Sequence, residues 1–98
     1  MIKSFRYKGI QAFFENASKA GIQAHHIDRL RRQLLALNHA TSAECMNVPG
    51  WKLHSLNGYN SKGQSLKKHW SIAVNAGWRL TFTFENENVH LVDYQDYH

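Results

Sequence analysis

The chain contains little cysteine, proline or acidic charge. Its one cysteine, Cys45, excludes an internal disulfide, which fits the reducing environment of the cytoplasm. A single proline and 43% hydrophobic residues predict a folded globule, because disordered chains are poorer in apolar side chains. At 98 residues there is room for one core, so we expect a single domain over residues 1–98.

Long apolar segments are also missing. No stretch approaches the roughly 20 apolar residues that a membrane-spanning helix needs. Residues 1–6 lack the apolar core of a secretion signal. We therefore expect a soluble, cytoplasmic protein with no membrane contact.

Several motifs that carry metal or nucleotide chemistry are absent. The seven histidines form no helical His-x-x-x-His pair, and one cysteine cannot form Cys-x-x-Cys, so the ligand spacing typical of zinc is missing. Gly58 and Gly63 are not followed by the Gly-Lys-Ser/Thr of a P-loop, and there is no Gly-x-Ser-x-Gly turn of a serine hydrolase. We expect neither a metal nor another cofactor.

The middle of the chain has no acidic residue between Glu44 and Glu85. Five cations lie in the same interval: Lys52, Lys62, Lys67, Lys68 and Arg79. With a formal net charge of +5, the protein should attract polyanions, so nucleic acid or an acidic protein is the first partner to consider. Many small soluble proteins are mildly basic, however, so charge alone does not select a function.

The first half of the chain has the periodicity of helices. Residues 2–6 alternate partly and predict a short strand. Apolar residues at helical spacing predict helices from Lys8 to about Ser18 and from Ala24 to Asn38, with Gly21 as the stop between them. Two helices joined by a short turn should pack antiparallel. Residues 41–50 predict a loop with at most one helical turn.

After residue 50 the period changes to that of strands. Alternation predicts strands over residues 51–55, 70–74, 78–85 and 89–94, and the polar, glycine-rich residues 57–66 predict a mobile loop. On the third of these strands Trp78, Leu80, Phe82 and Phe84 share one face, which we expect to join Trp70 in the core. The predicted fold is α+β, with an N-terminal strand and two antiparallel helices packed on a mainly antiparallel sheet of four to five strands.

Cleavage of RNA is one chemistry that these residues suit. Attack by the 2′-hydroxyl on the adjacent phosphate needs a base, an acid and a cation, and an imidazole with a pKa near 6.5 serves for both proton transfers. His54 and Arg79 both alternate with core residues and should face outward. Either one alone is more often an ordinary surface residue, but outward positions on neighbouring strands can converge on one sheet face. Tyr59, Tyr94 and Tyr97 are candidate surfaces for unstacked bases.

Several runs of residues resemble the HigB-type toxins of the RelE superfamily, found in bacterial type II toxin–antitoxin modules. The resemblance covers nearly the whole chain. The runs that carry it are Met1-Ile2-Lys3-Ser4-Phe5 with Lys8-Gly9, Ala20-Gly21-Ile22, Lys52-Leu53-His54, Trp70-Ser71-Ile72, Trp78-Arg79-Leu80-Thr81-Phe82 and Tyr94-Gln95-Asp96-Tyr97-His98.

The resemblance implies a RelE-like fold and a metal-independent endoribonuclease that cuts translated mRNA on the 70S ribosome. It also implies a HigA-like helix-turn-helix antitoxin as partner, through which the pair would bind operator DNA and repress its own operon. In such a toxin His54 and His98 would share the general base and acid roles, Arg79 would bind the scissile phosphate and Tyr97 would orient the substrate. We expect the outward basic residues to bind RNA. They are Lys62, Lys67, Lys68, Arg29, Arg31 and Arg32.

One position departs from the family's pattern. The family usually has Lys-Gly shortly after the histidine, where this chain has Asn57-Gly58 followed by a longer loop. A neutral amide cannot replace an ammonium in stabilising the transition state. Either a loop lysine, Lys62 or Lys67, has taken the role, or cleavage is weak. The alternative function is a catalytically weak or inactive RelE-fold module that binds antitoxin or ribosome and takes part in autorepression.

Overall fold

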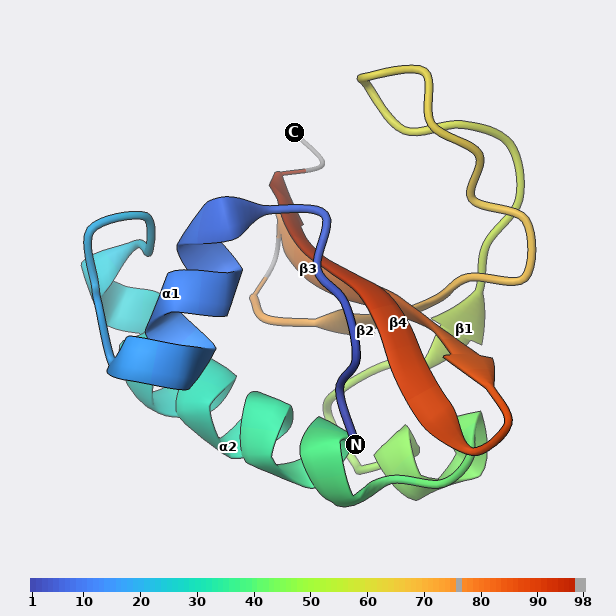
Figure 1. Cartoon of the computed structure of the whole chain (residues 1–98), viewed down its shortest axis with the longest axis horizontal. Coiled ribbons are helices and arrows are strands. Elements are labelled where there is room, and N and C mark those ends of the chain that lie inside the picture. The colour runs from blue at the N-terminus through green and yellow to red at the C-terminus, as the bar shows by residue number, and fades with distance from the viewer. Residues whose placement is uncertain (76, 97–98) are drawn as a thin grey trace.

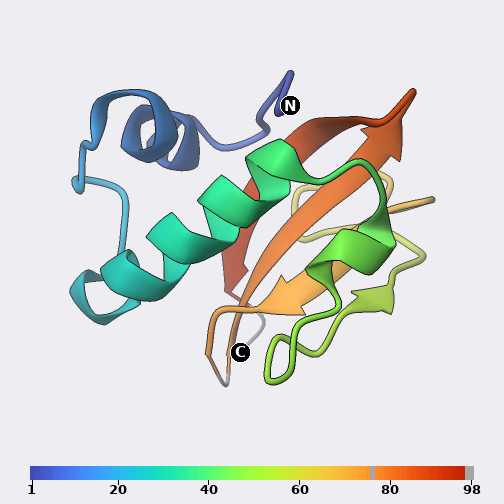
Figure 2. The same ribbon diagram turned by 90° about the horizontal axis from the view of Figure 1, so that it is seen from below.

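Two helices cover one face of a four-stranded antiparallel sheet in the computed structural model, which describes residues 1–75 and 77–96 (Figures 1 and 2). The helices are α1 (Lys8–Asn16) and α2 (Ile27–His39), with short 3₁₀ turns η1 (Ala24–His26) and η2 (Ala43–Met46). The strands are β1 (His54–Ser55), β2 (Trp70–Ala73), β3 (Trp78–Glu85) and β4 (Asn88–Asp96), and each pairs with the next along the chain. The predicted α+β class is confirmed.

The core lies between α2 and the sheet. Leu30, Leu34 and Leu37 are fully or almost fully buried on one face of α2. They belong to one cluster with Leu80 and Phe82 of β3, which are also fully buried. The spacing of three and four residues on the helix and of two on the strand is the spacing that brings one face of each element inward. The predicted core residues Trp70, Trp78 and Phe84 are partly buried and pack against this cluster.

The N-terminal segment is not a continuous strand. It runs beside β4 through two isolated parallel bridges, Ile2 with Val89 and Phe5 with Val92. Between those bridges β4 has an irregularity, where Leu91 takes a left-handed φ of 58° and the register with β3 shifts. Because such a bulge breaks the regular spacing of hydrogen-bonding groups, it prevents a continuous ladder. The sheet therefore has four strands, and the predicted N-terminal strand is reduced to two bridges.

The first helix ends earlier than predicted. Ala17 takes a left-handed φ of 58° and its N–H bonds to Phe13 O at 3.0 Å, so the helix stops before Gly21. Gly21 has a different role, because a Cβ there would lie 2.5 Å from Tyr7 Oη. That close approach lets the Tyr7 hydroxyl donate to Gly21 O at 3.0 Å.

No helix within the described residues is long and apolar enough to cross a lipid bilayer.

A buried histidine, His26, joins the start of α2 to the sheet. Asn75 Oδ1 accepts from Gly77 N–H at 3.2 Å, so Asn75 Nδ2 is the group that donates to His26 Nε2 at 2.6 Å. His26 Nδ1 therefore carries the proton and donates to Tyr94 Oη at 2.6 Å. Both ring nitrogens are satisfied only in the neutral form. Burial, followed by the nearby charge of His25, lowers the pKa of His26.

We predict that the protein loses stability as the pH falls below the ordinary histidine pKa of 6.5. The unfolded chain then binds a proton that folded His26 resists, so the stabilisation is complete above that pH and lost below it. His26→Gln should reduce this pH dependence and cost about 1–3 kcal/mol at neutral pH. Urea unfolding at about pH 5.5 and about pH 7.5 measures both effects.

His39→Gln is the matched control, because His39 is exposed at the end of α2. His69 is also buried with a lowered pKa, so the His26 variant should keep part of the pH dependence. An unchanged pH dependence in His26→Gln would show that His26 is not one of the groups responsible.

Candidate active site

A row of polar side chains crosses the sheet on the face opposite the helices. The registers pair His54 with Ser71, Ser71 with Thr81, and Thr81 with Asp93. Direct partners in antiparallel strands project to the same side, and the fully buried apolar residues of β3 project to the other. His54 and Asp93 thus stand at opposite ends of a row that crosses all four strands.

Arg79 lies on the same face, one step along β3 from this row. It is two residues from Thr81, so it shares that parity, and it pairs with Gln95 on β4. His54 and Arg79 are separated by about 10 Å across two strand spacings and about 7 Å along the strands. A substrate that spans this separation could contact both side chains. The structure therefore places these two predicted site residues on the same face of the sheet, without direct contact between them.

His54 is exposed and its ring is oriented by two neighbours. Nδ1 lies 3.0 Å from Lys52 O, which only accepts, so Nδ1 carries the proton of the neutral ring. Ser71 Oγ lies 3.3 Å from Nε2 and 3.5 Å from Nδ1, and with Nδ1 protonated by its contact to Lys52 O, Nε2 keeps its lone pair. A neutral imidazole in this tautomer presents Nε2 as a proton acceptor, which is the state a general base requires.

Arg79 has unused hydrogen-bonding capacity. Its side chain is half-buried, and Nη1 is buried without a hydrogen-bond partner in the described part of the chain. Its strand partner Gln95 donates instead to Thr81 Oγ1 at 2.9 Å. Guanidinium groups bind phosphate with paired N–H donors, and Arg79 is the half-buried guanidinium that β3 presents on this face.

The segment between β1 and β2 folds over the same face. Its own Leu66 and His69 are buried, and Ser71 and Thr81 of the sheet are fully buried as well. This segment therefore covers the middle of the face. The loop predicted to be mobile is organised by its own hydrogen bonds, including an isolated bridge between Tyr59 and Ser65.

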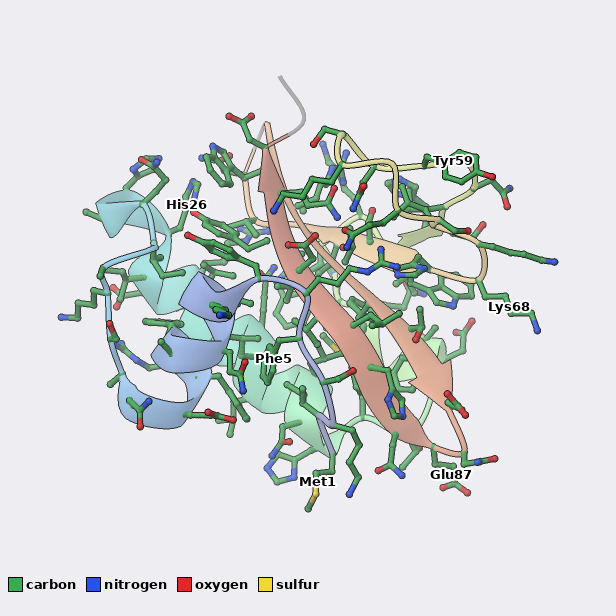
Figure 3. All side chains as sticks on the ribbon, turned by 45° about the horizontal axis from the view of Figure 1, so that its top comes forward. Met1, Phe5, His26, Tyr59, Lys68 and Glu87 are labelled. Atoms are coloured by element: carbon green, nitrogen blue, oxygen red, sulfur yellow. The ribbon has the colours of Figure 1, made fainter. Side chains whose placement is uncertain are left out.

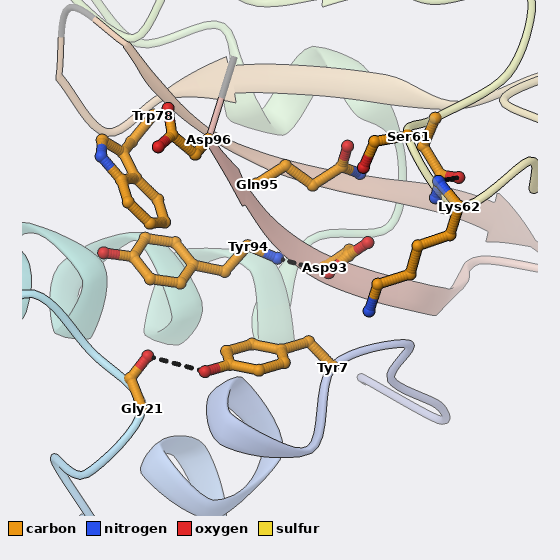
Figure 4. A pocket seen from close by; sticks show the side chains of 10 residues that line it. Tyr7, Gly21, Ser61, Lys62, Trp78, Asp93, Tyr94, Gln95 and Asp96 are labelled. Carbon is orange, nitrogen blue, oxygen red and sulfur yellow. Dashed lines mark hydrogen bonds between the residues drawn. The ribbon is translucent and has the colours of Figure 1, made fainter. Parts of the chain in front are cut away.

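Two pockets open at the end of the sheet where β4 finishes. The larger, about 290 Å³, lies between the loop tip and the aromatic side chains of Tyr7, Trp78 and Tyr94 (Figure 4). The smaller, about 250 Å³, lies between the same loop tip and β4. Both are lined by Gln95 and Asp96, the two residues that precede Tyr97 in the chain. The predicted site residues Tyr97 and His98 themselves lie outside the described residues.

The three loop lysines occupy two different places. Lys62 lines the larger pocket and points toward Asp93 (Figure 4). Lys67 and Lys68 line a separate pocket of about 520 Å³ on the other side of the loop, and Lys68 extends away from the body of the molecule (Figure 3). Of the two lysines that the sequence left open as substitutes at position 57, only Lys62 lies beside Gln95 and Asp96.

Asp93 is a buried carboxylate that sequence reasoning passed over. It is 8% exposed, and burial is the main reason that its pKa is raised. Tyr94 N–H donates to its Oδ1 at 2.9 Å, and the charges of Lys62, Arg6 and His69 act in the opposite direction on the pKa. An acidic residue inside the apolar run of the last strand was a visible signal of this group.

The predicted RNA-binding arginines lie on the other layer of the protein. Arg29 donates to Gly50 O at 2.9 Å, Arg31 pairs with Asp28 at 3.3 Å, and Arg32 is exposed on α2. Helix α2 covers the opposite face of the sheet (Figure 2). The structure therefore does not bring these arginines together with the loop lysines.

The prediction that Tyr94 offers a surface for unstacked bases is wrong. Tyr94 is 6% exposed, and its ring stacks on Trp78 at a centroid distance of 4.5 Å and on Tyr7 at 6.4 Å. It is part of the core cluster, so almost none of its ring is available to stack on a base. Tyr59, by contrast, is 74% exposed at the loop (Figure 3).

No group of three or more histidine, cysteine, aspartate or glutamate side chains that is arranged to hold a metal ion occurs within residues 1–75 and 77–96.

A family model described as the RelE-like toxin of type II toxin–antitoxin system HigB matches residues 3–98. The chain belongs to this HigB-like toxin family. It is also similar to the protein of Proteus vulgaris named Endoribonuclease HigB, with 39% identity over 98 residues, which is the full length of both chains. The resemblance inferred from the sequence motifs is confirmed.

We predict that His54 of this HigB-like toxin is the Nδ1-protonated tautomer when its ring is neutral. Nitrogen NMR of the imidazoles at mildly alkaline pH, where histidines are neutral, distinguishes the two tautomers. Ser71→Ala should leave the tautomer unchanged, because the Lys52 carbonyl sets it. A neutral ring protonated on Nε2 would contradict the geometry and remove the proposed proton acceptor.

Proposed function

We propose that this chain is the toxin of a type II toxin–antitoxin module and an endoribonuclease that cleaves translated mRNA. The observation that carries the proposal is that His54 and Arg79 lie on the same face of the sheet. In the neutral ring of His54 the Nε2 atom can accept a proton, and the guanidinium of Arg79 supplies a positive charge. Membership of the HigB-like family and the name of the Proteus vulgaris relative support the same chemistry.

The proposed reaction is metal-independent attack by the RNA's own 2′-hydroxyl. His54 Nε2 suits removal of the 2′-proton, because that nitrogen carries the lone pair. Arg79 would hold the non-bridging phosphate oxygens as their charge develops. His98 would share the acid–base work by protonating the departing 5′-oxygen, and Tyr97 would orient the nucleotide.

Lys62 supplies the cation that Asn57 lacks. Asn57 is exposed and lines the smaller pocket, so a neutral amide stands where the family usually has an ammonium. Lys62 reaches the neighbouring pocket from the tip of the same loop. A positive charge near the phosphorane-like transition state is the function that the departure at position 57 would otherwise remove.

The 70S ribosome would hold the message in the geometry that cleavage requires. The two pockets are small and open, and they offer little surface that would hold a free RNA strand in a reactive geometry. A message held on the ribosome is already positioned, and positioning is worth several kcal/mol in rate. Lys67 and Lys68 would contact RNA phosphates near the site. Arg29, Arg31 and Arg32 would contact ribosomal RNA at a separate surface.

The remaining partners follow from the family. We propose a HigA-like helix-turn-helix antitoxin, which neutralises the toxin in the cytoplasm and carries the pair to operator DNA.

A second candidate function is a RelE-fold module that binds antitoxin and ribosome without efficient cleavage, and the exposed Asn57 is the observation that favours it. Primer extension on a translated message after induction separates the two, because only the nuclease produces defined 5′ ends.

We predict that cleavage depends on the ribosome. Purified protein should cut a message in a programmed ribosome complex and leave the same RNA intact in buffer, because the free enzyme lacks the positioning contribution. Gel analysis of the two reactions at equal protein concentration makes the comparison. Equal cutting of naked RNA would contradict ribosome dependence while leaving the nuclease assignment standing.

Arg79→Ala should slow cleavage on the order of a hundredfold or more, since it removes a charge aimed at the transition state. His54→Ala should cause a loss of similar size. Lys19→Ala is the control, because it removes one positive charge from an exposed position that belongs to neither the proposed site nor the proposed ribosome contacts. Growth arrest and primer extension give the readouts in cells. Full activity of Arg79→Ala would exclude Arg79 from the site.

A further inference from the structure

The tip of the covering loop has a well-defined conformation. Asn60 Oδ1 accepts from both Lys62 N–H at 3.0 Å and Gln64 N–H at 2.9 Å, while Asn60 Nδ2 donates to Gln64 Oε1 at 2.8 Å. Gly63 N–H closes the turn on Asn60 O at 3.0 Å and takes a φ of 75°. These bonds fix the backbone from which the Lys62 side chain extends.

The loop is also attached to the body of the protein. Arg6 donates from Nη2 to Ser65 O at 3.1 Å, and Leu66 is buried at 5% exposure. These contacts hold the loop against the protein just after its tip. The one cation of the tip, Lys62, faces the larger pocket, and the carboxylate across that pocket is Asp93 (Figure 4).

We propose that Asp93 is a positioning residue for Lys62, holding the Lys62 ammonium in the pocket beside Gln95 and Asp96, where it meets the scissile phosphate. This inference rests on the proposed nuclease function. The attraction acts at a distance: no ion pair of 4 Å or less joins Lys62 to Asp93 in the described part of the chain. The ammonium is therefore steered toward the pocket and keeps its N–H donors available for a phosphate.

Burial makes a charge at position 93 costly, and the nearby charges of Lys62, Arg6 and His69 offset only part of that cost. Asp93 is 8% exposed, and removing an ionised carboxylate from water is costly. Its raised pKa has the same origin and means that the folded state favours the neutral acid. Asparagine has nearly the same shape and can accept from Tyr94 N–H as Asp93 does. A charge retained at a cost in stability is expected where function uses it.

The test is a double-mutant cycle on cleavage in a saturated ribosome complex. Lys62→Gln should slow the cleavage step roughly tenfold to a hundredfold, and Asp93→Asn by about tenfold. The double variant should be no slower than Lys62→Gln, because Asp93 acts through Lys62. Lys62→Arg should retain most of the activity. Binding to the ribosome should change little in any of these variants.

The matched control is the same cycle with Lys68→Gln. Lys68 belongs to the same loop and carries the same charge, but it lines a different pocket and extends away from the body of the molecule (Figure 3). The rate losses caused by Lys68→Gln and by Asp93→Asn should therefore multiply in the double variant. Thermal unfolding supplies the second readout: Asp93→Asn should unfold at the same or a higher temperature than the wild type while cutting more slowly.

Three outcomes would overturn the inference. The first is full activity of Asp93→Asn, and the second is multiplicative rate losses in the Lys62 cycle. The third is a fall in both the unfolding temperature and the cleavage rate of Asp93→Asn, which would mark Asp93 as structural. If the wild type cuts and Arg79→Ala does not, any of these results rejects the role of Asp93 but leaves the proposed nuclease function standing. A wild type that leaves translated message intact rejects the proposed function, and the role of Asp93 with it.

Discussion

Burial of one face of β3 against α2 is the constraint on which the site depends. Leu80 and Phe82 are completely buried, and the two-residue period of a strand then places Arg79 and Thr81 on the opposite face. Pairing through β2 extends that polar face to His54 of β1, and pairing with β4 extends it to Asp93. A slip of one residue would exchange the two faces, so the same apolar contacts that stabilise the fold also fix where the guanidinium is presented.

The covering loop then decides which part of the polar face is available. Its buried Leu66 and His69 cover the centre, and the pockets remain at the end marked by Gln95 and Asp96. The tip of this loop carries Lys62, which lines the larger pocket. The loop and its cation therefore meet the sheet at the end where Gln95 and Asp96 lie.

Two buried titratable groups show how differently a polar core residue can act. His26 has hydrogen-bond partners for both ring nitrogens in its neutral form, and these bonds join the start of α2 to the sheet. Asp93 carries its charge at a cost, because burial opposes ionisation. The first group is explained by stability. For the second we propose a functional explanation, the positioning of Lys62.

The sequence by itself determined the α+β class, the two helices, β3 and the outward direction of His54 and Arg79, because these depend on periods of two to four residues. Only the tertiary structure decided the rest. The bulge at Leu91 changes the parity of β4, buries Tyr94 and leaves the N-terminal segment with two bridges. Likewise, only the folded loop places Lys62, and not Lys67, in the pocket beside β4, because local periodicity does not encode a contact between segments about 30 residues apart.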